Sequence, residues 1–273
     1  MKIHLNLWRL VKGMELGLLG KVAVVTGASR GIGKVIAMGL AEEGVKLAIC
    51  ARGEGELRET ANEIESKTGV EVFWKAVDVT KPEDVKDFFK LVIERFGKID
   101  ILVNNAGRAQ PGTFDELSDE DWMNDIKVKL FSMIRCSREV IPYMKKQRWG
   151  RIINVNAIIG RQSLPGFMAT TTNRGSCLAF TKALSDELAK YNILVNSVNI
   201  GFVKTPQWIN IHKKRGVGLT FEQFMQKFVD YIPLGRWGEP EEVANIVVFL
   251  ASEKSSYITG ASIDVGGGFG RYI

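Results

Sequence analysis

The stretch KVAVVTGASRGIG, residues 21–33, decides the fold that we expect for this chain. Its first half is a short apolar run, which is typical of a parallel strand buried between two layers of helices. Its second half carries Gly27, Gly31 and Gly33, which remove side chains where the backbone turns tightly into a helix. At such a helix N-terminus the backbone N–H groups can hold a pyrophosphate. The pattern predicts a dinucleotide-binding turn, although a glycine-rich turn without a ligand has the same pattern.

Outward from this stretch, strands and helices alternate along the whole chain. We expect strands at 21–26, 45–50, 70–77, 101–103, 151–156, 193–198 and 261–265, and helices at 33–43, 54–68, 82–96, 119–147, 169–190 and 239–251. Pro142 indicates a bend in the last part of the longest helix. This alternation predicts one α/β domain, a doubly wound Rossmann fold with a mostly parallel seven-stranded sheet. We expect the domain at residues 19–273, preceded by an extension at 1–18.

Composition narrows the class of protein. With 273 residues, of which 45% are hydrophobic and 25% charged, the chain can bury one large core. No apolar run reaches the roughly 18 residues of a membrane-spanning helix, so we expect no membrane partner. The net charge is +6, but most basic residues are interleaved with acidic ones along the chain rather than gathered in a basic patch. This distribution favours an anionic cofactor over nucleic acid. The 3 cysteines lie far apart, which argues against a disulfide or metal site and indicates a cytoplasmic setting.

Several motifs together carry a resemblance to a known family. They are TGASRGIG at 26–33, the pair Asp78 and Val79, NNAG at 104–107, NSVNIGFVKTP at 196–206 and ITGASIDVGGG at 258–268. On these motifs the chain resembles the short-chain dehydrogenase/reductase family, in particular its 3-oxoacyl-[acyl-carrier-protein] reductase-like members. The resemblance covers nearly everything after residue 18 and implies an oxidoreductase that binds a nicotinamide dinucleotide at the carboxyl ends of the strands.

The resemblance also implies which residues contact the cofactor. It assigns the phosphates to the glycine turn, the adenine to the end of the third strand, the middle of the cofactor to NNAG and the nicotinamide to the segment after the sixth strand. In this chain the corresponding residues are Gly27, Ser29, Arg30, Gly31, Ile32, Gly33, Asp78, Val79, Asn104, Asn105, Ala106, Gly107, Arg174, Val203 and Thr205. The NNAG segment can equally serve only to shape the turn at the end of a strand, and both roles are compatible.

The charge after the second strand indicates the form of the cofactor. A carboxylate there binds the ribose of NAD, whereas arginine pairs well with the 2′-phosphate of NADP. This chain has Arg52 at that place and Arg30 within the glycine turn, so we expect NADP rather than NAD. The alternative is that Arg52 is only an exposed loop residue.

The active-site pattern departs from the family. The resemblance assigns catalysis to an asparagine, a serine, a tyrosine and a lysine, and their places are taken here by Lys129, Ala157, Thr170 and Arg174. None of the 5 tyrosines is followed by a lysine four residues later. Because an aliphatic hydroxyl is a far weaker acid than tyrosine, Thr170 cannot donate a proton without help from an adjacent group.

Lys129 is our candidate for the missing acid. The resemblance places it close to Arg174, and both this like charge and burial would lower the pKa of the lysine toward neutrality. Its alternative is a lysine that extends to solvent or contacts the cofactor, without catalysis. Two functions therefore stay open: an oxidoreductase with a rearranged proton donor, and an inactive NADP(H)-binding sensor or partner subunit.

Residues 206–235 correspond to the variable substrate region of the family. Its apolar side chains are Trp208, Ile209, Ile211, Leu219, Phe221, Phe224, Met225 and Phe228. They indicate an apolar substrate pocket under a mobile lid, or the packing of an amphipathic helix on the body of the protein. The resemblance further implies a homotetramer or homodimer that acts on a small-molecule substrate.

Overall fold

The computed structural model describes residues 15–272, so most of the expected N-terminal extension lies outside the described residues. These residues form a seven-stranded sheet of order β3-β2-β1-β4-β5-β6-β7, in which every neighbouring pair is parallel. The strands are β1 (Val22–Thr26), β2 (Lys46–Ala51), β3 (Val72–Ala76), β4 (Ile101–Asn104), β5 (Gly150–Ala157), β6 (Ile193–Ile200) and β7 (Ser262–Val265). The strand order reverses between β1 and β4, and this switch point is where doubly wound folds bind ligands.

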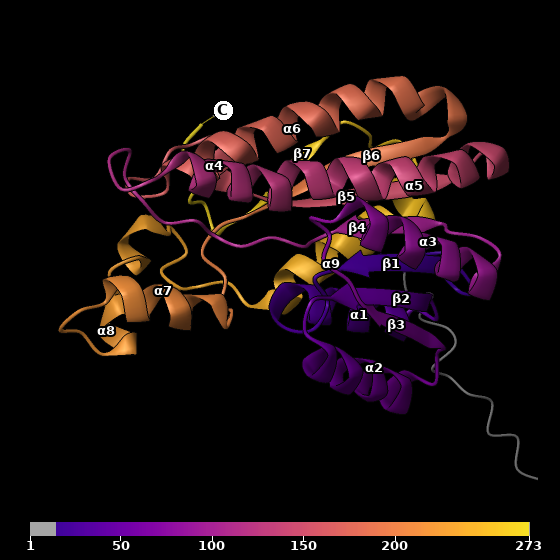
Figure 1. The fold of residues 1–273 in the computed structure, drawn as a ribbon, viewed down its shortest axis with the longest axis horizontal. Coiled ribbons are helices and arrows are strands. Elements are labelled where there is room, and N and C mark those ends of the chain that lie inside the picture. Colours follow the sequence, from indigo (N-terminus) through magenta and orange to yellow (C-terminus); the bar gives the residue numbers. More distant parts are fainter. Residues whose placement is uncertain (1–14, 273) are drawn as a thin grey trace, which may run out of the picture.

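Two layers of helices cover the sheet, as Figure 1 shows. The helices are α1 (Gly31–Glu42), α2 (Glu54–Thr68), α3 (Pro82–Phe96), α4 (Asp119–Ile126), α5 (Ser132–Gln147), α6 (Met168–Leu188), α7 (Gln207–Arg215), α8 (Phe221–Gln226) and α9 (Pro240–Ala251). One apolar cluster joins α1, α2 and α9 to one face of the sheet, and a second joins α3, α5 and α6 to the other. The predicted doubly wound fold is confirmed. Within residues 15–272 no helix is long and apolar enough to cross a membrane.

Most predicted elements begin and end within two residues of the observed ones. The expected helix at 119–147 is the exception, because a π-helical turn, Lys127–Phe131, divides it into α4 and α5. Pro142 lies inside α5, which continues past it to Gln147, so the irregular segment lies earlier than the sequence suggested. The start of α4 follows the sequence closely, since Ser118 and Asp121 form a reciprocal capping box.

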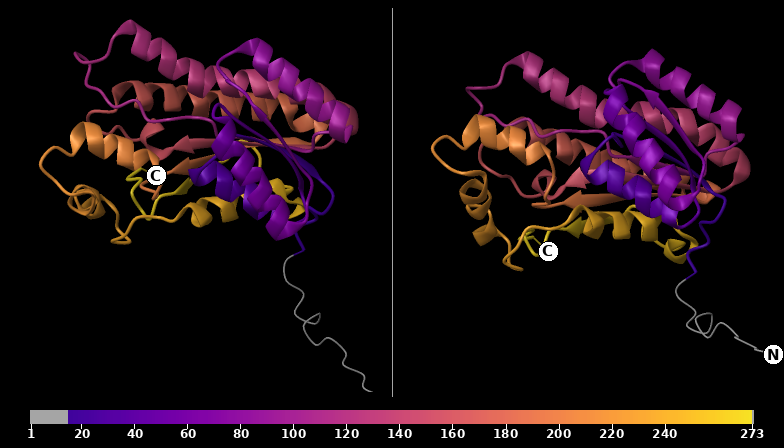
Figure 2. Two further views of the ribbon diagram at one scale, coloured as in Figure 1. Left: turned by 60° about the horizontal axis from the view of Figure 1, so that its bottom comes forward. Right: turned by 90° about the horizontal axis from the view of Figure 1, so that it is seen from below.

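The segment after β6 forms two short helices that the sequence analysis did not place. In Figures 1 and 2, α7 and α8 lie at one end of the molecule, beyond the two helix layers. Trp208, Ile211 and Phe224 are buried there in a third apolar cluster, in which the aromatic rings pack on one another. For these three side chains the structure shows the packing interpretation rather than an apolar pocket. The open hollow beside this segment, of about 700 Å³, is lined by Pro111, Glu116, Lys214, Arg215 and Val217.

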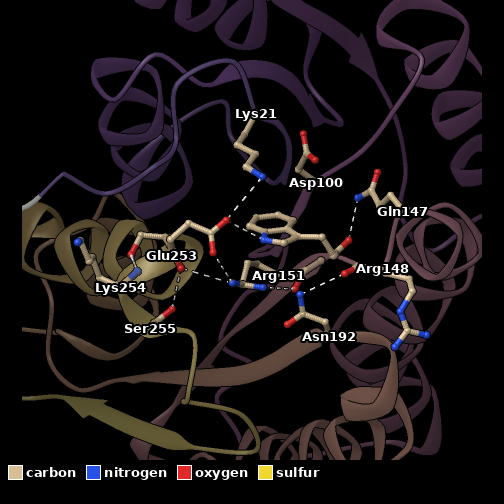
Figure 3. Close-up of polar contacts among 12 residues, drawn as sticks. Lys21, Asp100, Gln147, Arg148, Arg151, Asn192, Glu253, Lys254 and Ser255 are labelled. Carbon is tan, nitrogen blue, oxygen red and sulfur yellow. Dashed lines mark hydrogen bonds and ion pairs between the residues drawn. The ribbon is translucent and has the colours of Figure 1, made fainter.

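The opposite end of the sheet is held by a cluster of charges around Trp149. Figure 3 shows Lys21, Arg151 and Glu253 of this cluster converging from distant parts of the chain. The Lys21 ammonium and the Arg151 guanidinium lie 3.7 Å and 4.3 Å from the Trp149 ring centroid, and the indole N–H donates to Glu253 at 2.9 Å. Close by, the Glu253 amide donates to the carbonyl of Leu16. These contacts fix the amino ends of β1 and β5 far from the carboxyl ends, where the site lies.

Candidate active site

The glycine turn has the backbone geometry that the sequence predicted. Gly27 and Gly31 have positive φ angles of 68° and 57°, a region that favours glycine. Gly33 has no room for a side chain, because a Cβ atom there would lie 2.3 Å from the carbonyl oxygen of Gly27. The turn therefore brings bare backbone to the N-terminus of α1 at the switch point of the sheet.

The segment after β4 packs directly against this turn. The Asn105 side-chain amide donates to the carbonyls of Thr26 and Gly27 at 2.9 and 3.0 Å. The Thr26 hydroxyl accepts from the amides of Asn105 and Ala106, each at 3.0 Å. Asn104 is buried and donates to Asn154 on β5 at 2.9 Å. The structure thus shows the turn-shaping role for this segment, and the cofactor role of its residues stays a prediction.

The residues predicted to meet the two ends of the cofactor border the same edge of the sheet. Thr205 is brought to the glycine turn, since a Cβ on Gly31 would lie 3.9 Å from its side chain. Arg30 is exposed and forms a 3.4 Å ion pair with Glu56, an interaction of modest strength at a surface. Arg52 is exposed and forms no ion pair with any other residue of the described range 15–272. Both arginine side chains are therefore exposed, and Arg30 would have to give up its contact with Glu56 to meet a phosphate.

Asp78 and Val203 are both engaged in contacts within the protein. Asp78 accepts hydrogen bonds from the amide and the hydroxyl of Thr80 at 2.9 and 2.7 Å. Burial raises the pKa of Asp78, but these hydrogen bonds and the charge of Arg52 outweigh it, so the pKa stays below its ordinary value. Val203 is buried and pairs with Gly238 through its backbone. The Val203 side chain is therefore not open to a ligand, and the cofactor role of Val203 stays a prediction.

Lys129 lies in the π-helical turn between α4 and α5, inside the protein. Such turns are rare and occur frequently at functional sites. Here the Ser132 hydroxyl donates to the carbonyls of Val128 and Lys129 at 2.7 and 3.1 Å. The Lys129 side chain is 0% exposed, so the expectation that it extends to solvent is wrong.

Three polar groups surround the Lys129 amine. It donates to the Asp125 carboxylate, with which it is in direct contact, and to the Thr170 hydroxyl at 3.0 Å. Burial, followed by the nearby charge of Arg174, lowers the pKa of Lys129 from 10.5 to about 7, although Asp125 acts in the opposite direction. The predicted lowering of this pKa, and its two predicted causes, are confirmed.

Thr170 connects Lys129 to the loop that follows β4. Its hydroxyl accepts from the Gln110 amide at 2.8 Å and donates to the Gln110 carbonyl at 3.2 Å. The same loop is fixed by Ala109, whose amide donates to the side chain of Gln207 at the start of α7. Thr170 is only 3% exposed, so both of its partners, the lysine and the loop, cover it.

Arg174 lies one turn further along α6 and is buried as well. One terminal nitrogen donates to the carbonyl of Val155 on β5 at 2.9 Å, while Nε is buried and has no hydrogen-bond partner within the described chain. A Cβ on Gly107 would lie 2.9 Å from the other terminal nitrogen, Nη2. The guanidinium therefore spans from β5 to the segment after β4. Ala157 ends β5 and contributes no polar side chain.

Three residues of this cluster were not found from the sequence: Asp125, Asn173 and Gln110. Asp125 is 1% exposed and its second oxygen accepts from the Asn173 side chain at 2.8 Å. The spacing of Asp125 and Lys129, four residues apart on a helix, is the one available signal, because such residues share a face. Gln110 acts through its backbone, which no sequence pattern reveals.

This arrangement defines a class of protein. A glycine turn at the switch point of a doubly wound sheet holds dinucleotides, and a buried amine beside a hydroxyl can exchange protons near neutral pH. Within residues 15–272 no group of three or more His, Cys, Asp or Glu is placed to hold a metal. The fold and site are those of a dinucleotide-dependent oxidoreductase or of a relative that binds the same ligand.

Comparison with known sequences identifies the family. The family model described as enoyl-(acyl carrier protein) reductase matches residues 27–270. A 3-oxoacyl-[acyl-carrier-protein] reductase of Aquifex aeolicus is 39% identical over 255 residues, which are 93% of this chain and 99% of the relative. The chain belongs to the short-chain dehydrogenase/reductase family.

Solved structures agree with this assignment. L-Sorbose reductase from Gluconobacter frateurii, in complex with NADPH and L-sorbose, superposes with a TM-score of 0.91 at 37% identity, over 95% of this chain and 100% of that one. An NADPH-bound short-chain oxidoreductase from Pseudomonas aeruginosa PAO1, described as containing an atypical catalytic center, gives 0.87 at 34% identity, over 93% and 99% of the two chains.

Proposed function

We propose that this protein is an NADP(H)-dependent oxidoreductase in which Lys129, acting through Thr170, exchanges a proton with the oxygen of a carbonyl or alcohol substrate. The hydrogen bond of 3.0 Å between Lys129 and Thr170 carries this proposal, because it joins a buried amine to the hydroxyl that takes the place of the family's tyrosine. During reduction the Thr170 proton passes to the substrate oxygen, and the Lys129 ammonium replaces it. The relay supplies the acidity that an aliphatic hydroxyl lacks by itself.

The residues present fit a bound NADP. The turn through Gly27 and Gly31 carries no side chain at these two positions, next to the α1 N-terminus where a pyrophosphate would lie, and the Nε of Arg174 is a buried donor with no partner within the described chain. Ser29, Ile32, the Asn104–Gly107 segment and Thr205 border the same edge and would line the cofactor. When bound, the nicotinamide supplies or accepts the hydride. Relatives of similar fold that are described as NADPH complexes support this form of the cofactor.

The burial of the Thr170 side chain supports a second candidate function. The Gln110 backbone both donates to the Thr170 hydroxyl and accepts from it, so this hydroxyl is not available to a substrate while the loop is in place. This arrangement supports a protein that binds NADP(H) without turnover, as a sensor or partner subunit. Purified protein is therefore tested for NADPH binding by fluorescence and for NADPH oxidation against a panel of carbonyl compounds, apolar ones included. The test includes a fourfold variant with Lys129→Asn, Ala157→Ser, Thr170→Tyr and Arg174→Lys. Turnover by the wild type supports the oxidoreductase, and turnover by the fourfold variant alone supports the second function.

We expect tighter binding of NADPH than of NADH. Arg30 and Arg52 flank the place of the 2′-phosphate, and charge-assisted hydrogen bonds of this kind contribute about 1.5–3 kcal/mol, or about tenfold or more in affinity. The Arg30–Glu56 ion pair is exposed, so a phosphate can replace it. Arg52→Asp is expected to reverse the preference in a fluorescence titration. Equal dissociation constants for the two cofactors in the wild type contradict the prediction.

The rate of carbonyl reduction is expected to depend on the protonation of Lys129. Since the proton donor is the ammonium form and its pKa is lowered to about 7, kcat/KM for reduction is constant below this pH and falls above it, up to about tenfold per pH unit. Oxidation of the alcohol, which needs the neutral amine, shows the opposite dependence. Initial rates between pH 5.5 and 9 in both directions test this. A reduction rate that rises through pH 7 excludes the lysine as the acid.

We further propose a homotetramer or homodimer. Met123, Phe131, Tyr143 and Met168 are exposed apolar side chains on the long helical layer of α4, the π-helical turn, α5 and α6, and Tyr257 is fully exposed just before the edge strand β7. Burial of such surfaces is the usual driving force for symmetric association. Light scattering at micromolar concentration is expected to give a multiple of the 30.4 kDa chain mass, and the mass of a single chain argues against it. The 3 buried free cysteines fit a reducing cytoplasm.

A further inference from the structure

A carboxylate lies behind the proposed proton donor. Asp125 is in the last turn of α4 and is 1% exposed. One of its oxygens contacts the Lys129 amine, and the other accepts a hydrogen bond of 2.8 Å from Asn173 on α6. Both oxygens are therefore engaged, and the orientation of the carboxylate is fixed from two different helices.

The charges around Lys129 give this carboxylate a definite electrostatic role. The ionisable groups that face the amine are Asp125 on α4 and Arg174 and Cys177 on α6. Burial raises the pKa of the Cys177 thiol, which therefore stays neutral. With the amine protonated, two cations face one anion, so Asp125 is the only counter-charge that the described residues supply to it. Without Asp125, a protonated Lys129 would face the Arg174 guanidinium alone, and the amine would lose its proton more readily.

We propose that Asp125 is the positioning residue for the proton donor. It holds the Lys129 amine against Thr170 and keeps that amine protonated near neutral pH, while Asn173 holds the Asp125 carboxylate in place. The proposal rests on the proposed function of Lys129. Lys129, which replaces the family's asparagine, thus works as a unit with Asp125 and Asn173.

A purely structural ion pair explains the cluster less well. A buried ion pair contributes little net stability compared with packed apolar residues, because both charges lose their hydration. Furthermore, the second hydrogen bond of the amine points to Thr170, not to another carboxylate. Thr170 and Asn173 lie three residues apart on α6 and so share a face, which lets one helix orient both ends of the Asp125–Lys129 pair.

The first experiment compares pH profiles of reduction for the wild type, Asp125→Asn, Asp125→Leu and Asp125→Glu. Glu120→Gln, which removes an exposed carboxylate from the same helix, is the matched control. An opposite charge in contact shifts a pKa by about 1–3 units, so in the Asn and Leu variants the fall in kcat/KM is expected about 1–3 pH units lower than in the wild type. Asp125→Glu retains the wild-type midpoint with a lower rate, and Glu120→Gln retains both. A lower rate with an unchanged midpoint in the Asn and Leu variants overturns the proposal.

The second experiment needs no turnover and uses the protein without cofactor. Between about pH 7 and pH 10.5, Lys129 is neutral in the folded protein but protonated in the unfolded chain. The unfolded state then binds more protons, so the free energy of unfolding rises with pH over this range. In the wild type this rise begins near pH 7, and it is absent in Lys129→Met. Asp125→Asn and Asp125→Leu are expected to begin the rise at least about one pH unit lower, whereas Glu120→Gln does not move it.

The two readouts separate the proposals. A wild type without turnover refutes the proposed function, and the stability profile then decides the role of Asp125 by itself. An onset that does not move in the Asn or Leu variant overturns the inference even if the wild type is active. Should one of these variants not fold at neutral pH, recovery of the fold at pH 9 supports the inference, because a neutral amine needs no counter-charge. If neither Asp125→Asn nor Asp125→Leu folds at neutral pH or at pH 9, while the double variant Asp125→Leu/Lys129→Met folds, the ion pair serves only the structure. That result overturns the inference.

Discussion

Replacing Lys129 with methionine is expected to reduce the rate of carbonyl reduction by about two to four orders of magnitude, the usual contribution of a positioned general acid. Methionine fills a similar volume but has no proton to give, so Thr170 loses its acidic partner. NADPH affinity is expected to change little, because Lys129 is fully buried below Thr170. Single-turnover rates and fluorescence titrations measure the two effects separately.

Lys127→Met is the matched control for this prediction. Lys127 lies in the same π-helical turn, two residues earlier, and its side chain is exposed. The control is expected to keep the wild-type rate. Because Lys129→Met leaves the Asp125 carboxylate buried without its partner, circular dichroism must show that the variant is folded. Equal activity of folded Lys129→Met and the wild type refutes the role of the lysine.

Replacing Gly33 with alanine is expected to weaken NADPH binding by about tenfold to a hundredfold. The added Cβ would lie 2.3 Å from the Gly27 carbonyl oxygen and 2.4 Å from the Asn105 amide, so the turn must move outward. Overpacking of this kind costs about 1–3 kcal/mol, and the displaced backbone would occupy the space of the pyrophosphate. Fluorescence titration and urea unfolding measure the losses of affinity and of stability.

Gly55→Ala is the control in the following βαβ unit, β2–α2–β3. Gly55 lies within α2, and no atom lies within 4 Å of the place of its Cβ. Alanine there is expected to leave NADPH affinity unchanged and not to destabilise the protein, since Gly55 does not have a positive φ and its Cβ would meet no other atom. If Gly33→Ala behaves like Gly55→Ala, the glycine turn does not hold the cofactor.

The fold was largely predictable because buried parallel strands and capped helices leave local signals. The apolar run before Gly27 and the capping box at Ser118 are examples, and β1 and the start of α4 lie where the sequence placed them. The two helices after β6 were missed because they are short, so that each carries only one or two buried apolar residues.

The site was predictable only in part. The resemblance correctly brought Lys129 and Arg174 together, and elementary electrostatics gave the direction of the pKa shift. Asp125 was missed because its burial depends on how α4 and α6 pack, which spacing alone does not fix. The π-helical turn likewise has no sequence pattern as distinct as that of a capping box.

The pairing of Thr170 with Gln110 has a consequence for affinity. The Thr170 hydroxyl can serve a substrate only in those molecules in which the Gln110 backbone has moved away, because the loop uses the same donor and acceptor. The measured dissociation constant of a substrate then equals its intrinsic constant divided by the population of this open form. A ligand that stabilises the open loop would raise that population and tighten substrate binding without touching the substrate.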